Sequence, residues 1–363
     1  MLNRYAKLLA LTTIACLPLM TGASAQEKPL KKVVIAMGSS VINIGYPAHT
    51  TAQYMGYWKQ EGYDVELVTA GGSLQAIQQL VGGNAQFAQG NSTPVIQGVV
   101  THNLPLKIAM MNTVIDWAIG VPEGSPIKEA KDFKGKQIGI FSLATGNLAL
   151  LRSYLAHAGL KEGDYELVSI GFGPPAEQAI KSGRVDAVFF WGSGIAAFQN
   201  TVKLRRLYGE DWKTYPDYAL AVLQSTADKD PQMVIGIARG MAKATAFSLE
   251  NPECVRKLYW KHNPPSLPPG VTMEVQGQRD MNILMAQLET IDDAFKLTGS
   301  KVIGKTDVGD YDRLQKFLAE TKQIGRTVPS QHFLGFSTDI SKEINNFDVE
   351  AVRQSARSCT LPG

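Results

Sequence analysis

The sequence is poor in the residues that build metal sites and covalent catalytic sites. Its 363 residues include only 5 histidines and 3 cysteines. The histidines are scattered, without the short spacings of zinc ligands, at His49, His102, His157, His262 and His332. No Walker loop, calcium loop or zinc-binding helix motif occurs. We therefore expect no metal, no cofactor and no catalytic residue.

The chain also lacks a strong charge of either sign. Its 36 Lys and Arg residues and 33 Asp and Glu residues leave a formal net charge of +3. No basic stripe interleaved with aromatic residues appears, which argues against nucleic acid as a partner. Apolar residues make up 44% of the chain and charged residues 19%, so the chain can bury a large core and is not disordered.

Long apolar runs are missing after the first 25 residues. Residues 1–7 carry Arg4 and Lys7 and no acid, residues 8–20 are almost purely apolar, and residues 23–25 read Ala-Ser-Ala. This order is typical of a signal peptide, and the run is shorter than the roughly 20 residues of a membrane-spanning helix. We predict that residues 1–25 are a cleaved signal peptide and that the mature protein works in the periplasm.

The three cysteines leave two questions open. Lipidation of Cys16 is an alternative reading of the N-terminus, although residues 13–16 (TIAC) lack the leucine usual three positions before such a cysteine. Cys254 and Cys359 lie beyond the predicted cleavage point. In an oxidising compartment they can pair, and they can equally be two unrelated thiols.

Short β-rich runs alternate with helix-length segments from residue 31 to about residue 191. The pattern of strand, turn and helix occurs in two similar blocks, at about 31–115 and 120–210. Such alternation predicts parallel sheets with right-handed crossovers, hence an α/β fold in two lobes. Between the blocks, residues 113–121 form an extended run before Pro122 and are a candidate hinge.

The pattern changes after Tyr218. Residues 219–223 resemble one more strand, and Asp230-Pro231 has the N-cap and first-turn residues of a helix that runs to Glu250. Four prolines in residues 263–270 predict an extended loop, and helices are expected at 272–296 and 307–323. We predict a first lobe at 26–117, a second lobe at 118–218, and a return to the first lobe with a C-terminal helical tail at 219–363.

Three segments resemble one protein family in that family's order. Residues 56–67 read GYWKQEGYDVEL, residues 124–139 read GSPIKEAKDFKGKQIG, and residues 176–187 read AEQAIKSGRVDA. They resemble the periplasmic substrate-binding proteins of ABC importers, in the branch that serves nitrate, aliphatic sulfonates, taurine and thiamine-precursor pyrimidines. The resemblance spans about residues 31–260.

The resemblance implies a two-lobed periplasmic binding protein fold of type II, in which each lobe is a mainly parallel sheet flanked by helices. It implies a monomer that closes on a small-molecule ligand and delivers it to an ABC permease and its ATPase. A pyrimidine thiamine precursor is an alternative ligand. A pyrimidine-synthesising enzyme that uses pyridoxal phosphate, on the same fold, and a sensor that docks to a receptor are alternative functions.

The site is expected where the strands end. In open α/β sheets, ligands bind beyond the carboxyl ends of strands, beside helix N-termini whose first N–H groups lack partners and carry positive partial charge. Such ends bind anions, so we expect a small organic anion, a sulfonate or a carboxylate. Polar residues and one glycine follow the predicted strands and are candidate ligand contacts, although the polar ones can equally be ordinary N-caps: Ser39, Ser40, Ser73, Asn91, Ser92, Ser142, Thr145, Gly146, Asn147 and Ser193.

Thr145-Gly146-Asn147 is the strongest of these candidates, because the resemblance implies that a hydroxyl and a glycine there hold the anionic group. Three aromatic residues, Tyr46, Trp117 and Trp191, are candidates to enclose an apolar part of the ligand, with ordinary packing as their alternative role. Asp116, beside Trp117, can bind a cation or an amine, although a carboxylate in a hinge more often pairs with the backbone.

Two segments match enzyme motifs only by letter. Residues 90–94 (GNSTP) resemble a nucleophile elbow, but proline replaces the final glycine and no patterned His and acid follow. Residues 171–176 (GFGPPA) match a dinucleotide fingerprint, but two prolines remove amide donors that a pyrophosphate needs. We predict a binding protein and not an enzyme.

Overall fold

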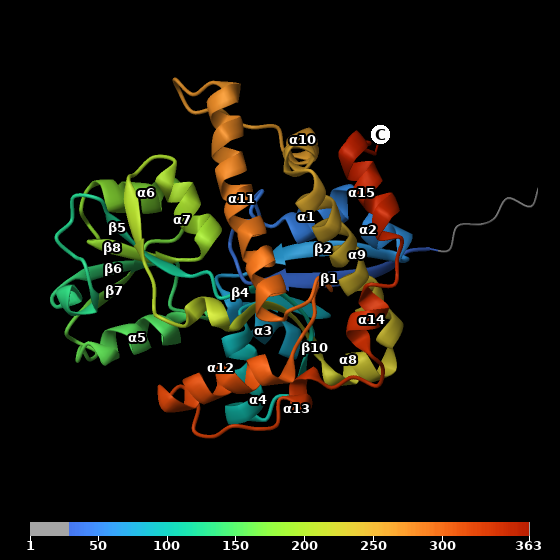
Figure 1. Ribbon diagram of the computed structural model, residues 1–363, viewed down its shortest axis with the longest axis horizontal. Helices are drawn as coiled ribbons and strands as arrows, with labels where there is room; N and C mark the ends of the chain where they lie inside the picture. Colours follow the sequence, from blue (N-terminus) through green and yellow to red (C-terminus); the bar gives the residue numbers. More distant parts are fainter. Residues whose placement is uncertain (1–28, 363) are drawn as a thin grey trace, which may run out of the picture.

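The computed structural model describes residues 29–362 and shows two α/β lobes side by side (Figure 1). The predicted signal peptide and Cys16 lie outside the described residues. Within residues 29–362, no helix is long and apolar enough to cross a membrane.

The first lobe contains a five-stranded sheet in the order β2-β1-β3-β10-β4. β10 is antiparallel to both of its neighbours, and the other four strands share one direction. The strands are β1 (Lys31–Met37), β2 (Tyr63–Thr69), β3 (Phe87–Gly90), β4 (Leu106–Val114) and β10 (Pro216–Leu223).

The second lobe repeats this arrangement with the order β7-β6-β8-β5-β9. Here β5 is the antiparallel strand, paired with β8 and β9. The strands are β5 (Ala118–Pro122), β6 (Gln137–Ile140), β7 (Glu166–Ser169), β8 (Ala187–Phe190) and β9 (Leu204–Leu207). The predicted α/β fold with mainly parallel sheets is confirmed. The antiparallel strands are the two that enter a lobe from the other one.

The helices cover the sheet faces. All four residues of β8 are buried, as is typical of a strand with helices on both faces. The helices of the two α/β blocks are α1 (Pro47–Tyr54), α2 (Tyr57–Gln60), α3 (Ser73–Val81), α4 (Ser92–His102), α5 (Leu148–His157), α6 (Pro174–Lys181) and α7 (Gly192–Gln199). Two 3-10 turns, Ala130–Phe133 and Trp212–Thr214, complete these blocks.

The chain passes between the lobes twice. Residues 115–117 lead from β4 to β5, within the predicted hinge, and residues 208–215 lead from β9 back to β10. The predicted boundary at residue 117 ends the first passage, and the one at residue 218 lies inside β10. Each passage therefore leads directly into the antiparallel strand of the lobe that it enters.

The C-terminal tail is helical. It comprises α8 (Gln224–Lys229), α9 (Pro231–Glu250), α10 (Pro252–His262), α11 (Met273–Leu297), α12 (Val308–Glu320), α13 (Gln331–Leu334), α14 (Ile340–Ile344) and α15 (Val349–Ser358). As predicted, α9 begins after Asp230, whose side chain accepts a hydrogen bond from the amide of Met233 at 3.0 Å.

One tail helix departs from the expected packing on the first lobe alone. α11 runs between the lobes, beside α7 (Figure 1). Asn282 of α11 donates a hydrogen bond to Asn200, just after α7, at 2.9 Å. Asp293 of α11 forms an ion pair with Lys213 in the second passage at 3.3 Å. The tail therefore also packs against the second lobe.

The two cysteines left open by the sequence form a disulfide. Cys254 on α10 is bonded to Cys359 at the end of α15, with Cα atoms 5.5 Å apart. The bond closes a span of 105 residues. It attaches the C-terminal helix to the helices that cover the first sheet.

We predict that replacing both cysteines, Cys254→Ser with Cys359→Ser, lowers the free energy of unfolding by about 2–4 kcal/mol, because a disulfide across a long loop restricts the unfolded chain. Urea unfolding with and without reductant measures the effect. The reductant should shift the native midpoint and leave the double variant unchanged. Equal midpoints for the native protein in both conditions would show that the bond contributes nothing.

Candidate functional site

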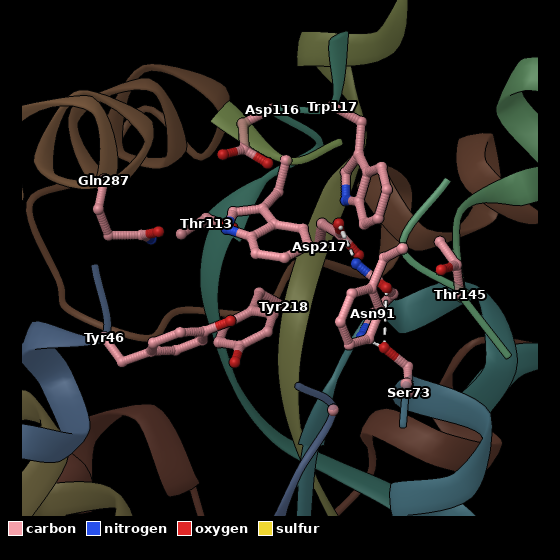
Figure 2. A pocket seen from close by; sticks show the side chains of 15 residues that line it. Tyr46, Ser73, Asn91, Thr113, Asp116, Trp117, Thr145, Asp217, Tyr218 and Gln287 are labelled. Atoms are coloured by element: carbon pink, nitrogen blue, oxygen red, sulfur yellow. Dashed lines mark hydrogen bonds between the residues drawn. The ribbon is translucent and has the colours of Figure 1, made fainter. Parts of the chain in front are cut away.

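A small cavity lies between the lobes, at the carboxyl ends of strands from both sheets. Figure 2 shows side chains of both lobes and of α11 directed toward it. Eight predicted site residues line it: Tyr46, Ser73, Asn91, Asp116, Trp117, Thr145, Gly146 and Trp191. The structure therefore brings together residues that are up to 145 positions apart, from Tyr46 to Trp191.

The cavity is about the size of one small ring. It leaves about 40 Å³ for the centres of water molecules. A sphere of that volume, extended by a water radius of about 1.4 Å, encloses roughly 180 Å³, and a protein cavity of about 150 Å³ accommodates benzene. In this conformation the site has room for a single substituted ring.

The first helix end at the cavity is already satisfied by a carboxylate of the protein. Asp217 in β10 accepts hydrogen bonds from the amide of Ser92 at the start of α4, at 2.9 Å, and from the side chains of Asn91 and Asn147 at 2.8 and 2.7 Å. Ser73 donates to Asn91 at 2.8 Å, which fixes the orientation of the amide (Figure 2). Burial raises the pKa of Asp217 to about 6, although these donors oppose the rise.

A second helix end is satisfied in the same way. Asp116, in the first passage between the lobes, accepts a hydrogen bond from the amide of Gly192 at the start of α7, at 2.8 Å. A Cβ at Gly192 would lie 2.7 Å from the Asp116 oxygen, so glycine permits this contact. Burial raises the pKa of Asp116 to about 7, because this carboxylate has fewer donors than Asp217.

Aromatic rings form much of the remaining wall. Trp191 meets Trp117 and Phe141 edge to face, each with ring centroids 5.8 Å apart. Tyr46 and Tyr218 lie on the first-lobe side, 6.1 Å apart (Figure 2). A ligand in this cavity would contact ring faces and edges over most of its surface.

Tyr218 has an unusual backbone conformation. Its φ of 44° is left-handed, which is uncommon for an aromatic residue and costs on the order of 1–3 kcal/mol. The side chain of Gln89 donates to its carbonyl at 2.9 Å and helps to hold it there. Its buried hydroxyl has no hydrogen-bond partner among the described residues. A strained residue with an unsatisfied polar atom at a cavity indicates a ligand contact.

The two lobes touch each other directly around the cavity. Ser142 of the second lobe donates to the carbonyl of Gly71 in the first lobe at 2.5 Å. The amide of Leu74 donates to the carbonyl of Ala144 at 3.3 Å. Gly72 fits beneath that carbonyl, since a Cβ there would lie 2.5 Å from the oxygen. These contacts define a closed arrangement of the lobes.

Six predicted site residues do not line the cavity. Two of them, Ser142 and Asn147, join the lobes through the hydrogen bonds described above. The other four lie elsewhere. Ser39 donates to the Val41 carbonyl, and Ser40 is exposed. The amide of Ser92 binds Asp217, and Ser193 lies beside Gly45 of the first lobe. For these residues the contacts are within the protein and serve turns, helix ends or the lobe interface.

Seven lining residues were not among the predicted ones: Gly38, Gly72, Thr113, Phe141, Asp217, Tyr218 and Gln287. A signal was present for two of them. Asp217-Tyr218 follows the second passage between the lobes, as Asp116-Trp117 ends the first, and both pairs place an acid before an aromatic residue. Gln287 belongs to α11, whose position between the lobes no sequence pattern indicated.

The described lining offers no metal-binding cluster and no lysine for pyridoxal phosphate. Among residues 29–362, no cluster of three or more His, Cys, Asp or Glu side chains could hold a metal ion. The described lining includes no lysine to form a Schiff base with that cofactor. The arrangement can enclose and orient a small molecule.

Fold and site together define a two-lobed protein with a ligand cavity at the lobe interface. The sequence profile of the family described as NMT1/THI5 like matches residues 47–254, and the chain belongs to that family. The family expected from the sequence is confirmed. The riboflavin-binding protein RibY of Chloroflexus aurantiacus is 23% identical over 245 residues, 67% of this chain and 69% of RibY.

Solved structures share the fold. The periplasmic aliphatic sulphonate binding protein SsuA from Escherichia coli is 19% identical, with a TM-score of 0.59 over 85% of this chain and 93% of SsuA. The desulfurization enzyme DszB is 16% identical, with a TM-score of 0.56 over 87% of this chain and 99% of DszB. The same fold thus serves binding proteins and an enzyme.

We predict that Asp116→Asn stabilises the ligand-free protein at pH 8 by about 1–3 kcal/mol, because it removes a buried charge and keeps an acceptor for Gly192. The raised pKa of about 7 means that ionisation of Asp116 costs stability as the pH rises from 4 toward 7. The difference between variant and native protein should therefore be smaller at pH 5 than at pH 8.

Urea unfolding of both proteins from pH 5 to pH 8 measures this difference. The charge of Asp217 contributes to the raised pKa of Asp116, so the comparison reports Asp116 together with its coupling to Asp217. A constant difference across this range would contradict the assignment of the titration to Asp116.

Proposed function

We propose that this chain is the solute-binding component of an ABC import system, which captures a small solute in the periplasm and delivers it to a permease and its ATPase. One observation carries the proposal: a cavity of one-ring size is enclosed jointly by both lobes, with hydrogen bonds between the lobes around it. Membership of the NMT1/THI5-like family and the shared fold with SsuA support it.

The mechanism is closure of one lobe on the other. The two passages at 115–117 and 208–215, which connect the lobes, are the segments that bend, and we propose that the chain acts as a monomer. In the closed form, Ser142 binds Gly71 and Asn147 binds Asp217 across the interface. A bound solute adds contacts to both lobes and so favours the closed form.

The residues that line the cavity support a function of binding without catalysis. No Cys, His, Lys or Arg lines the described cavity, and the carboxylates of Asp116 and Asp217 already bind backbone amides. The alternative of a pyrimidine-synthesising enzyme has no support at this site. DszB is an enzyme on the same fold, so turnover has to be tested rather than argued from the fold.

The size of the cavity narrows the ligand. RibY is named as a riboflavin-binding protein. Riboflavin has three fused rings and is larger than the closed cavity of this chain. A sulfonate, a carboxylate or a pyrimidine of one ring fits the volume. The charge of the lining argues against the first two, since Asp116 and Asp217 are the charged residues of the described lining and already bind the first amides of α7 and α4.

We predict that a one-ring solute from a thermal-shift library raises the melting temperature of the mature protein. At a concentration of 100 times the dissociation constant the gain is about 2.7 kcal/mol. Small-angle scattering should show a smaller radius of gyration with that solute, and mass spectrometry should recover it unchanged. Conversion of the solute by the purified protein would contradict the proposal, as would the absence of any stabilising solute.

A further inference from the structure

The charges at the cavity are all negative. Asp116 and Asp217 are the charged residues among those lining the described cavity. Arg206 lies near Asp116, but its guanidinium donates to Gln199 and lines a separate surface groove. A ligand that enters the cavity therefore meets carboxylates and no opposing cation.

The two carboxylates differ in the number of hydrogen bonds that they accept. Asp217 accepts hydrogen bonds from three donors, shared between its two oxygens. Asp116 accepts one from Gly192 through Oδ2, and its own backbone amide also donates to the carboxylate. A buried carboxylate with few donors from other residues is stabilised by a further hydrogen-bond donor, and best by a charged one.

The aromatic rings of the cavity also favour a positively charged ligand. Ring faces are electron-rich and attract cations that approach them, most strongly where water is excluded. Trp117 and Trp191 stand on the side of the cavity that holds Asp116, and Tyr46 and Tyr218 stand on the first-lobe side. The carboxylate and the rings thus favour positive charge together.

An anion is disfavoured at the starts of α4 and α7. The amides at the starts of α4 and α7 would be its natural donors, and both are bonded to aspartates of the protein. To bind there an anion would have to displace a buried carboxylate or approach it closely, and either arrangement costs free energy. The expectation of an anionic ligand rested most strongly on Thr145-Gly146-Asn147 at the start of α5, whereas the aspartates bind the first amides of α4 and α7.

We propose, on the basis of the solute-binding function above, that the ligand is a small organic cation of about one ring. An N–H group of this cation binds the carboxylate of Asp116, and its charged part lies against the aromatic rings. The unpartnered hydroxyl of Tyr218 is available to a second polar group of the ligand.

Three compounds of nearly identical shape test the charge directly: benzamidine, a cation, benzamide, which is neutral, and benzoate, an anion. Calorimetry at pH 8 should give benzamidine at least tenfold tighter binding than benzamide and no detectable binding of benzoate. Asp116→Asn should abolish the preference for benzamidine over benzamide. The matched control Asp292→Asn removes an exposed acid of α11 and should keep that preference.

A thermal-shift library of one-ring cations, neutral compounds and anions completes the test. Hits confined to cations, lost in Asp116→Asn and kept in Asp292→Asn, support the proposal whether or not benzamidine is among them. Hits that are mainly neutral or anionic, or a cation preference that survives in Asp116→Asn, overturn it and leave the solute-binding function standing. No hit in any class would overturn that function and the assignment of charge with it.

Discussion

Two buried carboxylates occupy the helix ends that meet between the lobes, and much of the site depends on them. A helix N-terminus leaves amide groups unpaired and carries positive partial charge, so it requires an acceptor when it is buried. Asp217 supplies one to α4 and Asp116 supplies one to α7. The positive ends of these helices are thereby neutralised from within the protein, and a solute meets negative charge and aromatic surface instead.

The same interactions connect the site to movement of the lobes. Asp116 lies in the first passage between the lobes, and Asp217 lies at the start of the strand that follows the second. Asp217 also accepts a hydrogen bond from Asn147 of the second lobe. Opening of the lobes would break that bond and expose a carboxylate that burial keeps partly protonated, with its pKa raised to about 6. Closure and the charge state of the site are therefore linked physically.

Local patterns in the sequence predicted most of the fold. Alternating strands and helices indicated the two lobes, and Asp230-Pro231 marked the start of α9 because capping is a local interaction. Polar residues after strands indicated the region of the site, but not which of them face the cavity. Ser142 and Asn147, both predicted ligand contacts, bind the opposite lobe and do not line the cavity. That distinction depends on how the lobes meet, which no local pattern records.

Other features depend on long-range packing for the same reason. The position of α11 between the lobes places Gln287 at the cavity, and the pairing of Cys254 with Cys359 requires α10 and α15 to lie side by side. The sequence shows an acid before an aromatic residue at both passages, but only Asp116-Trp117 was predicted as part of the site. The strand that begins at Pro216 was predicted to begin at Ala219, so Asp217 and Tyr218 were placed outside it.

The most direct test of this account is a crystal structure of the mature protein with a solute that raises its melting temperature. The account predicts that Gly192 and Ser92 still donate to Asp116 and Asp217, and that a nitrogen of the solute lies within hydrogen-bond distance of the second oxygen of Asp116. An anionic group bound to the amides of Gly192 or Ser92, with the aspartates turned away, would contradict it.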